Sequence, residues 1–496
     1  MRKTLSVAVA AATVATALIP GTSQAEPSHD LKWGACPADV SPGVPVPAGM
    51  QCATLKVPLD YRNPGGQKIE IAISRVASKK PDQRRGILLV NPGGPSAGLG
   101  YPATLVAAKM PQSVLDSYDV IGFDPRGIGH STPVSCDLTA QQQLYGNIPP
   151  YAKSAADVAK RAAEVQQIAK QCWSSETAAL LPHMSTANTA RDMDQIRSAL
   201  GETTASYLGA SWGTHLGAVY TTLFPQRSDR IVLDSNLAPG GWDYPSDRLW
   251  SQGVEDRLPD FAAYVAANFR EYGLGRTQAQ VIAKYHALAA RLDKKPVVAP
   301  DGVYDGAMFR LITFGYSYGA AQLPVLAQLW KSLDANQPPA PPGETKSAAS
   351  GADQLISGRY AIICNDSRWP TSVSTYQRAV AVDRVRYPLW GAAGANIQPC
   401  AYWPDATEPP VRVNDDGPAN VLMVQNLRDP ATPLVGARKL RQALGQRTTM
   451  VTADEGGHGV YLFGRNRCAN YAVTTFLTTG VRPAHDYACS AAAAPR

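Results

Sequence analysis

One serine of the chain lies in a setting that suits nucleophilic catalysis. Residues 209–213 read Gly-Ala-Ser-Trp-Gly, the pattern G-x-S-x-G, between an apolar run at 206–209 and a helix-like segment at about 212–224 that Pro225 ends. A sharp turn from a strand into a helix raises a serine hydroxyl above the edge of a sheet, and glycines on both sides avoid clashes there. The helix N-terminus also favours a developing negative charge. We therefore predict that Ser211 is a nucleophile.

A serine nucleophile needs a base. In proteins that carry the serine on such a strand–turn–helix, the catalytic residues follow one another along the chain in the order Ser, then Asp or Glu, then His. The histidines after Ser211 are His215, His286, His458 and His485. The first lies on the nucleophile's own predicted helix, the second in a helical segment with surface-like neighbours, and the last in the C-terminal tail. His458 instead lies in a glycine-rich loop at 455–459, after a predicted strand, from which an imidazole could reach Ser211. We predict that His458 is the base.

The acid that orients this base is predicted to be Asp429. It follows the preceding predicted strand, and its carboxylate would accept the second imidazole N–H and stabilise the imidazolium. Asp454 is the alternative, but it is too close to His458 along the chain to reach comfortably across the loop. Asp124 and Asp234 also end predicted strands, and we expect them to anchor turns and loops.

The tetrahedral intermediate of such a reaction needs two backbone N–H groups near the serine. One is predicted to be that of Trp212, which follows the nucleophile. The other should come from the loop Asn91-Pro92-Gly93-Gly94-Pro95, which follows an early apolar run. We favour Gly94, with Gly93 as the alternative.

These residues require a scaffold of buried strands. Short apolar runs occur at 86–90, 118–124, 206–209, 230–234, 420–424 and 448–451, and helical segments join them. Continuous apolar runs indicate a mostly parallel sheet with helices on both faces, which is an α/β fold. Between the fourth and fifth runs, segments 250–272 and 277–292 have helical spacing and 336–351 is rich in Pro, Ala, Gly and Ser. We predict a catalytic core at 26–236 and 413–496, and an inserted helical cap at 237–412 in which 336–351 is an exposed loop.

The composition bears on which partners are expected, and the N-terminal residues bear on the cellular compartment. The 496 residues carry a net charge of +7 without a basic cluster, so no nucleic-acid surface is predicted. Arg2 and Lys3 precede an apolar run at 7–19 and a Ser23-Gln24-Ala25 site, which predicts a secretory signal peptide cleaved after Ala25. The apolar run is too short to span a membrane, and no later segment is long and apolar enough.

The cysteines fit an oxidising compartment, because they are eight and the chain is predicted to be exported. Eight cysteines allow 105 pairings, so the sequence alone does not fix their connectivity. Because shorter loops close more readily, the spacing suggests local pairs. These are Cys36–Cys52, Cys136–Cys172, Cys364–Cys400 and Cys468–Cys489. No C-x-x-C pair suggests zinc, and no motif suggests any other metal or organic cofactor.

Several motifs in one order resemble a known family. Besides the motifs above, they are Asp124-Pro125-Arg126-Gly127-Ile128-Gly129-His130-Ser131, Val232-Leu233-Asp234, Asp429-Pro430-Ala431-Thr432-Pro433 and Gly457-His458-Gly459. Together they resemble the secreted actinobacterial tripeptidyl aminopeptidases, α/β-hydrolase peptidases related to proline iminopeptidase. The resemblance runs from Trp33 to Cys489, and the cysteines resemble that group's. Ser96, where a glycine is usual, and Asn236 depart from the pattern, and Ser96 could reshape the oxyanion loop.

The resemblance implies a serine exopeptidase that releases short peptides from free N-termini through an acyl-enzyme. Its substrate would be a peptide or protein N-terminus, and a cap carboxylate would hold the ammonium group. Asp366 is the first candidate, followed by Glu255 and Asp256. Tripeptides are the expected product, with di- or tetrapeptides and a preference for proline left open, and a monomer is expected. A secreted carboxylesterase or lipase with the same catalytic residues is the alternative, and a binding protein without activity is a more distant one.

Overall fold

The computed structural model describes residues 31–146, 148–300, 302–339 and 351–491. The predicted signal peptide and residues 340–350 of the predicted exposed loop lie outside these ranges. Within them, no helix combines the length and the apolar character that a membrane crossing requires.

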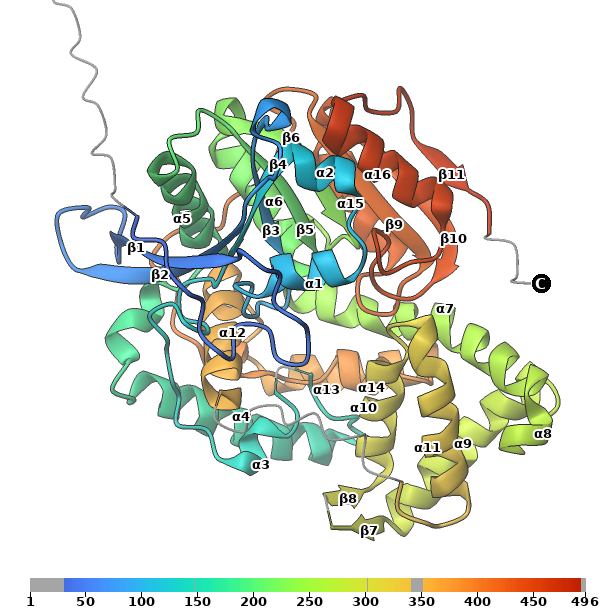
Figure 1. Ribbon diagram of the computed structural model, residues 1–496. Coiled ribbons are helices and arrows are strands. Elements are labelled where there is room, and N and C mark those ends of the chain that lie inside the picture. Colours follow the sequence, from blue (N-terminus) through green and yellow to red (C-terminus); the bar gives the residue numbers. More distant parts are fainter. Residues whose placement is uncertain (1–30, 147, 301, 340–350, 492–496) are drawn as a thin grey trace, which may run out of the picture.

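In the described part of the chain, nine strands form one sheet in the order β1-β2-β4-β3-β5-β6-β9-β10-β11 (Figure 1). β2 runs antiparallel to β1 and β4, and the other neighbours are parallel. The mostly parallel sheet confirms the predicted fold class, and the six predicted strands correspond to β3, β4, β5, β6, β9 and β10. The strands are β1 Gln51–Pro58, β2 Lys68–Val76, β3 Gly86–Asn91, β4 Tyr118–Phe123, β5 Ala205–Ala210, β6 Ser228–Asp234, β9 Val421–Arg428, β10 Thr448–Gly456 and β11 Tyr487–Cys489, with a separate hairpin of β7 Val297–Ala299 and β8 Gly302–Tyr304.

The central strands are apolar along their length because helices cover both faces of the sheet. In β3, which is buried throughout, Leu88 and Val90 pack into one hydrophobic cluster while Ile87 and Leu89 pack into another on the opposite face. Helices α1, α2 and α16 contribute to the first cluster, and α5, α6 and α15 to the second. These helices are α1 Tyr101–Ala107, α2 Gln112–Ser117, α5 Thr186–Ala199, α6 Trp212–Leu223, α15 Leu434–Ala443 and α16 Arg467–Thr479.

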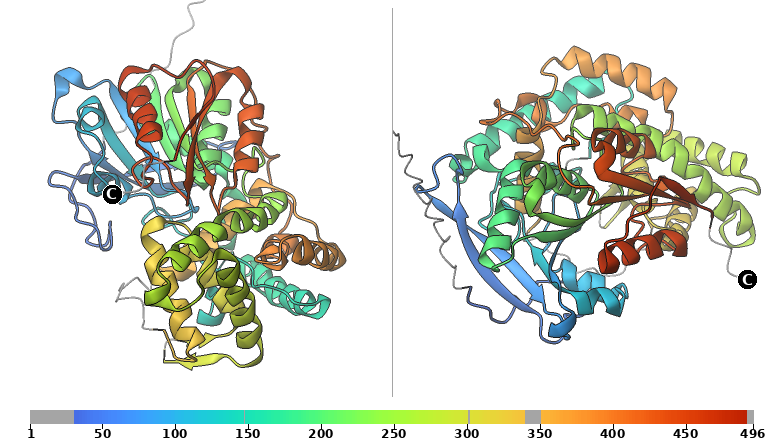
Figure 2. Two further views of the ribbon diagram at one scale, coloured as in Figure 1. Left: turned by 90° about the vertical axis from the view of Figure 1, so that its right-hand side faces the viewer. Right: turned by 90° about the horizontal axis from the view of Figure 1, so that it is seen from above.

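A second layer of helices lies beneath the sheet in the view of Figure 1, and Figure 2 shows it as a separate layer from the side. It contains most of the segment 237–412, together with α3 and α4, which come from the chain between β4 and α5. The helices are α3 Ala140–Gln143, α4 Ala155–Trp173, α7 Tyr244–Ala267, α8 Phe269–Tyr272, α9 Gln278–Lys294, α10 Gly306–Tyr316, α11 Leu323–Asp334, α12 Ala352–Asp366, α13 Val373–Arg386 and α14 Gly391–Gly394. Short 3₁₀ helices are η1 Pro81–Gln83, η2 Ala178–His183, η3 Pro225–Arg227, η4 Ala320–Gln322, η5 Pro399–Tyr402 and η6 Gly445–Arg447.

The helical layer has two parts with different packing. Helices α7, α9, α10 and α11 enclose a hydrophobic cluster of their own, in which Phe261, Tyr285 and Trp330 are buried. Helices α12 and α13 instead join the main cluster beneath the sheet, and α4 packs against α13 and η5. The part with α7, α9, α10 and α11 is therefore a bundle beside the core, and the part with α12 and α13 is an extension of the core.

Four disulfide bonds join the described cysteines in the predicted local pairs. They are Cys36–Cys52, Cys136–Cys172, Cys364–Cys400 and Cys468–Cys489, and none of the described cysteines is free. Cys364 lies on α12 and Cys400 in η5, so the third bond ties two elements of the helical layer together.

Candidate active site

Ser211 occupies a tight turn between β5 and α6. Its φ of 58° is in a region that residues other than glycine rarely adopt. Both flanking glycines are required by space, because a Cβ on Gly209 would lie 2.5 Å from the Gly213 carbonyl oxygen and one on Gly213 would lie 3.0 Å from that of Asn91. The strain of this turn presents the serine side chain at the carboxyl edge of the sheet.

His458 and Asp429 meet at the same edge. His458 follows β10, Asp429 follows β9, and the imidazole Nδ1 lies 3.1 and 3.0 Å from the two carboxylate oxygens of Asp429. Asp429 has no exposed side-chain area, whereas 13% of the His458 side chain is exposed. The geometry leaves Nε2 as the imidazole nitrogen available to a substrate or to Ser211.

The Asp429 carboxylate is held by its own loop. It accepts hydrogen bonds from the backbone N–H groups of Ala431 at 2.8 Å and Thr432 at 2.9 Å, and from the Thr432 hydroxyl at 2.9 Å. Burial would lower the pKa of His458, but the charge and hydrogen bond of Asp429 outweigh it and raise that pKa above its ordinary value. An imidazole with a raised pKa holds a proton more strongly once it has accepted one.

The loop that carries His458 is held from both layers. From the core, the buried Asp234 carboxylate accepts the N–H groups of Val460 and Tyr461, and the Ser235 hydroxyl accepts that of Gly459. Burial raises the pKa of Asp234 to about 6 against these hydrogen bonds. From the helical layer, the Tyr318 carbonyl accepts the His458 N–H at 2.6 Å. Asp234 thus anchors a loop, as its position after a strand predicts.

The predicted oxyanion loop lies directly against Ser211. A Cβ on Gly93 would lie 2.5 Å from the Ala210 carbonyl oxygen and 2.6 Å from Cβ of Ser211. The Gly93 N–H donates to Asn91 Oδ1 at 2.9 Å, whereas Gly94 lines the same cavity as Ser211. This occupied N–H favours Gly94 over Gly93 as the donor to an oxyanion. The hydroxyl of Ser96, the unusual residue here, donates to the Gly93 carbonyl at 2.8 Å and holds the loop.

Ser211 and His458 share a cavity of about 240 Å³ between the sheet edge and the helical layer. The core contributes loops that follow β3, β5, β9 and β10. The helical layer contributes Trp242, Trp250, Tyr318 and Arg359. Among the described residues that line it, Arg359 is the one Lys or Arg and there is no Asp or Glu.

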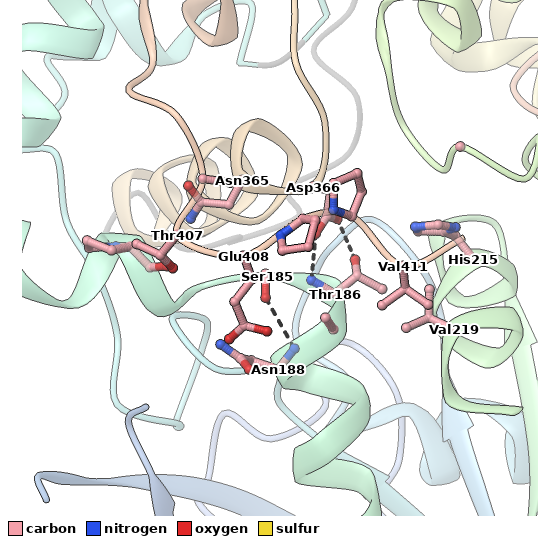
Figure 3. Close-up of a pocket in the computed structure, with 16 residues that line it drawn as sticks. Ser185, Thr186, Asn188, His215, Val219, Asn365, Asp366, Thr407, Glu408 and Val411 are labelled. Carbon is pink, nitrogen blue, oxygen red and sulfur yellow. Dashed lines mark hydrogen bonds between the residues drawn. The ribbon is translucent and has the colours of Figure 1, made fainter. Parts of the chain in front are cut away.

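The predicted amine-binding carboxylates do not line this cavity. Asp366 lies in a second, smaller cavity with His215 and Glu408, where its carboxylate accepts two hydrogen bonds from Thr186 (Figure 3). Glu255 accepts the Leu389 N–H at 2.9 Å, and Asp256 follows it on α7. The helix that carries them also carries Trp250 into the Ser211 cavity, whereas Asp366 points into the other one.

Two residues that the sequence offered as alternatives, Asp454 and His215, lie in other surroundings. Asp454 forms an ion pair with Arg428 at 2.6 Å and its side chain is 44% exposed, so its carboxylate does not orient His458. His215 points away from Ser211 into the second cavity, where burial lowers its pKa to about 4.

Sequence reasoning did not find the residues that the helical layer brings to the site. Tyr318 acts through a backbone carbonyl, which residue type does not reveal. Trp242 and Trp250 have the apolar character of any packed aromatic residue. Arg359 was the one signal that could have been used, because it is an arginine among apolar residues of a helical segment.

Comparison with known proteins finds relatives along nearly the whole chain. A family model described as "TAP-like protein" matches residues 387–489. The tripeptidyl aminopeptidase of Streptomyces coelicolor is 36% identical over 94% of this chain and 87% of its own. Serine protease Hip1 of Mycobacterium tuberculosis is 29% identical over 94% of this chain and 92% of its own, and carboxylesterase B of the same species is 31% identical over 89% and 86%. The order of the motifs, the sheet and these near-complete matches show that the chain belongs to the tripeptidyl aminopeptidase family of α/β-hydrolases.

Proposed function

We propose that this protein is a secreted serine exopeptidase that releases short peptides, most often tripeptides, from free N-termini. One observation carries the proposal: a serine at a strained strand–helix turn shares a cavity with a histidine whose second nitrogen contacts a buried carboxylate. The relatives named as aminopeptidase and serine protease support a peptide substrate. Four disulfides support export.

In the proposed reaction, Ser211 Oγ attacks the scissile carbonyl while His458 accepts its proton. The negative charge that develops on the carbonyl oxygen is stabilised by the N–H groups of Gly94 and Trp212. His458 then donates the proton to the leaving amine, and an acyl-enzyme remains. Water, deprotonated by His458, releases the peptide and restores the serine. Asp429 holds the imidazole throughout.

The helical layer supports an exopeptidase, because it closes the cavity opposite the sheet edge. Chain on the N-terminal side of the scissile bond must fit in the space between the loops and residues such as Trp242 and Trp250. For the ammonium group we retain Glu255 and Asp256, whose helix borders the cavity. Glu255→Gln and Asp256→Asn should raise KM for a free-amine peptide and leave KM for a simple ester unchanged.

An esterase is the second candidate, and one observation favours it. No Asp or Glu is present among the described residues that line the cavity, so a carboxylate for the ammonium group is not in place there. A relative of similar identity is named carboxylesterase B. Both activities use the same serine, and the substrate distinguishes them.

The function is tested with Ser211→Ala, which should abolish hydrolysis and labelling by a fluorophosphonate probe. Labelling of the wild-type protein alone would exclude a binding protein without activity. Rates are then compared on a free tripeptide anilide, its N-acetylated form and a p-nitrophenyl ester. A preference for the free amine of at least about tenfold supports the exopeptidase. Hydrolysis of the ester alone would make the protein an esterase, and full activity of the alanine variant would reject Ser211.

A further inference from the structure

Helix α12 of the helical layer contacts one part of the predicted oxyanion hole directly and the other part through Thr186. Arg359, which lies in this helix and lines the Ser211 cavity, donates from Nε to the Pro95 carbonyl at 2.8 Å. Pro95 directly follows Gly94, the predicted donor. From the core side the same loop is held at Gly93 by Asn91 and Ser96. Arg359 therefore holds the loop from the helical layer at the residue after Gly94. Further along the loop, the Asp124 carboxylate of the core accepts the N–H groups of Gly98 and Leu99.

The other contact begins at Asp366, the last residue of α12. Its carboxylate accepts the Thr186 backbone N–H at 2.8 Å and the Thr186 hydroxyl hydrogen (Figure 3). The same hydroxyl oxygen accepts the indole N–H of Trp212 at 3.1 Å. Trp212 is fully buried, so this bond fixes the ring of the residue whose backbone N–H is the second predicted donor. Asp366 also accepts the N–H of Thr186 in the first turn of α5, one of the helix N–H groups that have no partner within the helix.

Arg359 and Asp366 are seven residues apart, close to two helical turns, so they lie on the same face of α12. The helix is also held by other contacts. Asn365 donates to the carbonyls of Leu181 and Met184 in the chain before α5, and Cys364 is bonded to Cys400 of η5 within the helical layer. A Cβ on Gly358 would lie 2.7 Å from the Gly127 carbonyl oxygen, so the helix backbone is in close contact with a core loop. A helix held in this way can set the positions of the groups bound to it.

We propose that α12 positions the oxyanion hole, with Arg359 setting Gly94 and with Asp366, through Thr186, setting Trp212. Arg359, Thr186 and Asp366 are positioning residues, because they act through the groups that carry the donors: Arg359 binds the Pro95 carbonyl, Thr186 binds the Trp212 indole, and Asp366 binds Thr186. The inference rests on the proposed acyl-enzyme at Ser211. It assigns a catalytic consequence to the part of the helical layer that joins the core.

Thr186 offers a matched pair of variants. Thr186→Val keeps the shape but removes the hydroxyl that links Asp366 to Trp212, whereas Thr186→Ser keeps the hydroxyl. Thr186→Val should lower kcat at least about tenfold with KM within about threefold, because the donor acts on the transition state. Affinity for phenylboronic acid, whose adduct with Ser211 places an oxygen in the hole, should fall in parallel. Thr186→Ser should retain most of both.

Arg359→Met tests the other contact and should also lower kcat at least about tenfold. Ser357→Ala is the control on the same helix, since its hydroxyl binds the Cys136 N–H in the core and should leave kcat unchanged. If Ser211→Ala abolishes hydrolysis while Thr186→Val and Arg359→Met keep kcat within twofold, α12 does not position the hole. An equal loss in Thr186→Ser would overturn the role of the hydroxyl. Full activity of Ser211→Ala would instead reject the proposed function.

Discussion

At the scale of single residues, the site depends on a buried carboxylate beside an imidazole. Asp429 is satisfied by three hydrogen bonds from its own loop before it contacts His458. A carboxylate held in this way keeps its orientation while the proton moves between serine and imidazole. Asp366 differs from Asp429 in its partner: its carboxylate binds Thr186, which carries no charge, whereas Asp429 binds an imidazole that can become charged.

Asp429→Asn should lower kcat/KM by on the order of 10³–10⁴, because the imidazole loses its orientation and its stabilising charge. The catalytic imidazole must be neutral, so kcat/KM falls as pH falls through the pKa of His458. Asp429 raises that pKa, so its removal should move the acid limb of the profile to lower pH. A pH–rate profile of both proteins measures the shift. Asp454→Asn is the control, and a comparable loss there would assign the orienting role to Asp454.

Asp366→Asn should stabilise the protein at pH 8 and have a smaller effect at pH 5. Burial raises the pKa of Asp366 to about 7, above its value of 3.8 in an unfolded chain. The folded state therefore binds the proton more tightly, and the ionised carboxylate destabilises the fold above about pH 7. This penalty diminishes as pH falls from about 7 towards 4. Melting temperatures of the two proteins at both pH values test it, and an equal difference at both would contradict the raised pKa.

At the scale of elements, two tight turns face each other at the sheet edge. The turn from β5 to α6 carries Ser211, and the loop after β3 carries Gly93 and Gly94. Their backbones approach so closely that a Cβ on Gly93 would clash with the Ser211 turn. The separation between Ser211 and the predicted oxyanion donor is therefore set by glycines as much as by side chains.

Gly93→Ala should reduce kcat at least about tenfold. The new Cβ would lie within 2.6 Å of Ser211 Cβ and of the Ala210 carbonyl oxygen, at a φ of +92° that alanine rarely adopts. One of the two turns must shift, and misplaced donors stabilise the transition state less. Steady-state kinetics would measure the fall in kcat, with the concentration of active enzyme taken from the fraction that a fluorophosphonate labels. A variant with normal kcat would mean that the loop does not supply a donor.

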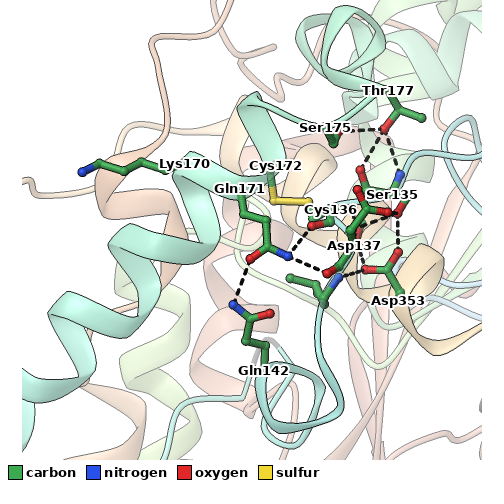
Figure 4. The surroundings of a disulfide bond; sticks show 12 residues. Ser135, Cys136, Asp137, Gln142, Lys170, Gln171, Cys172, Ser175, Thr177 and Asp353 are labelled. Carbon is green, nitrogen blue, oxygen red and sulfur yellow. Dashed lines mark hydrogen bonds between the residues drawn. A yellow bond between two sulfur atoms is a disulfide. The ribbon is translucent and has the colours of Figure 1, made fainter.

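At the scale of the whole molecule, helices from two stretches of chain, 140–173 and 244–394, form one layer under the sheet. The bond Cys136–Cys172 joins the chain after β4 to α4, and hydrogen bonds of Gln171 and Asp353 surround it (Figure 4). Asp353 is on α12, so this region links α4, α12 and the core.

The double variant Cys136→Ser/Cys172→Ser should lower the free energy of unfolding by about 3–4 kcal/mol, the loop-entropy expectation for a bond of sequence separation 36. Urea unfolding followed by tryptophan fluorescence measures the change. The activity per folded molecule should change little, since neither residue lines the Ser211 cavity. A loss below about 1 kcal/mol would show that the surrounding hydrogen bonds already restrain this region.

Much of the core could be predicted because its signals are local. Strands β3 to β6, β9 and β10 are continuous apolar runs, and the Ser211 turn requires its two glycines next to it. By contrast, β1 and β2 are amphipathic strands with charged residues such as Lys56 and Glu70 facing outward, and their sequences gave no comparable run. Helix α4 was missed for the same reason, since its small apolar residues are mixed with charged ones.

The sequence by itself determined the sharp turn at Ser211, the chain order of the candidate catalytic residues and the mostly parallel sheet that carries them. These follow from neighbouring residues and from the rule that parallel strands end at one edge. Only the tertiary structure decided which side chains of the helical layer reach that edge. It placed Arg359 in the Ser211 cavity and Asp366 behind Trp212, two turns apart on one helix. Such contacts join residues far apart in the chain and depend on how one helix packs, which no local pattern records.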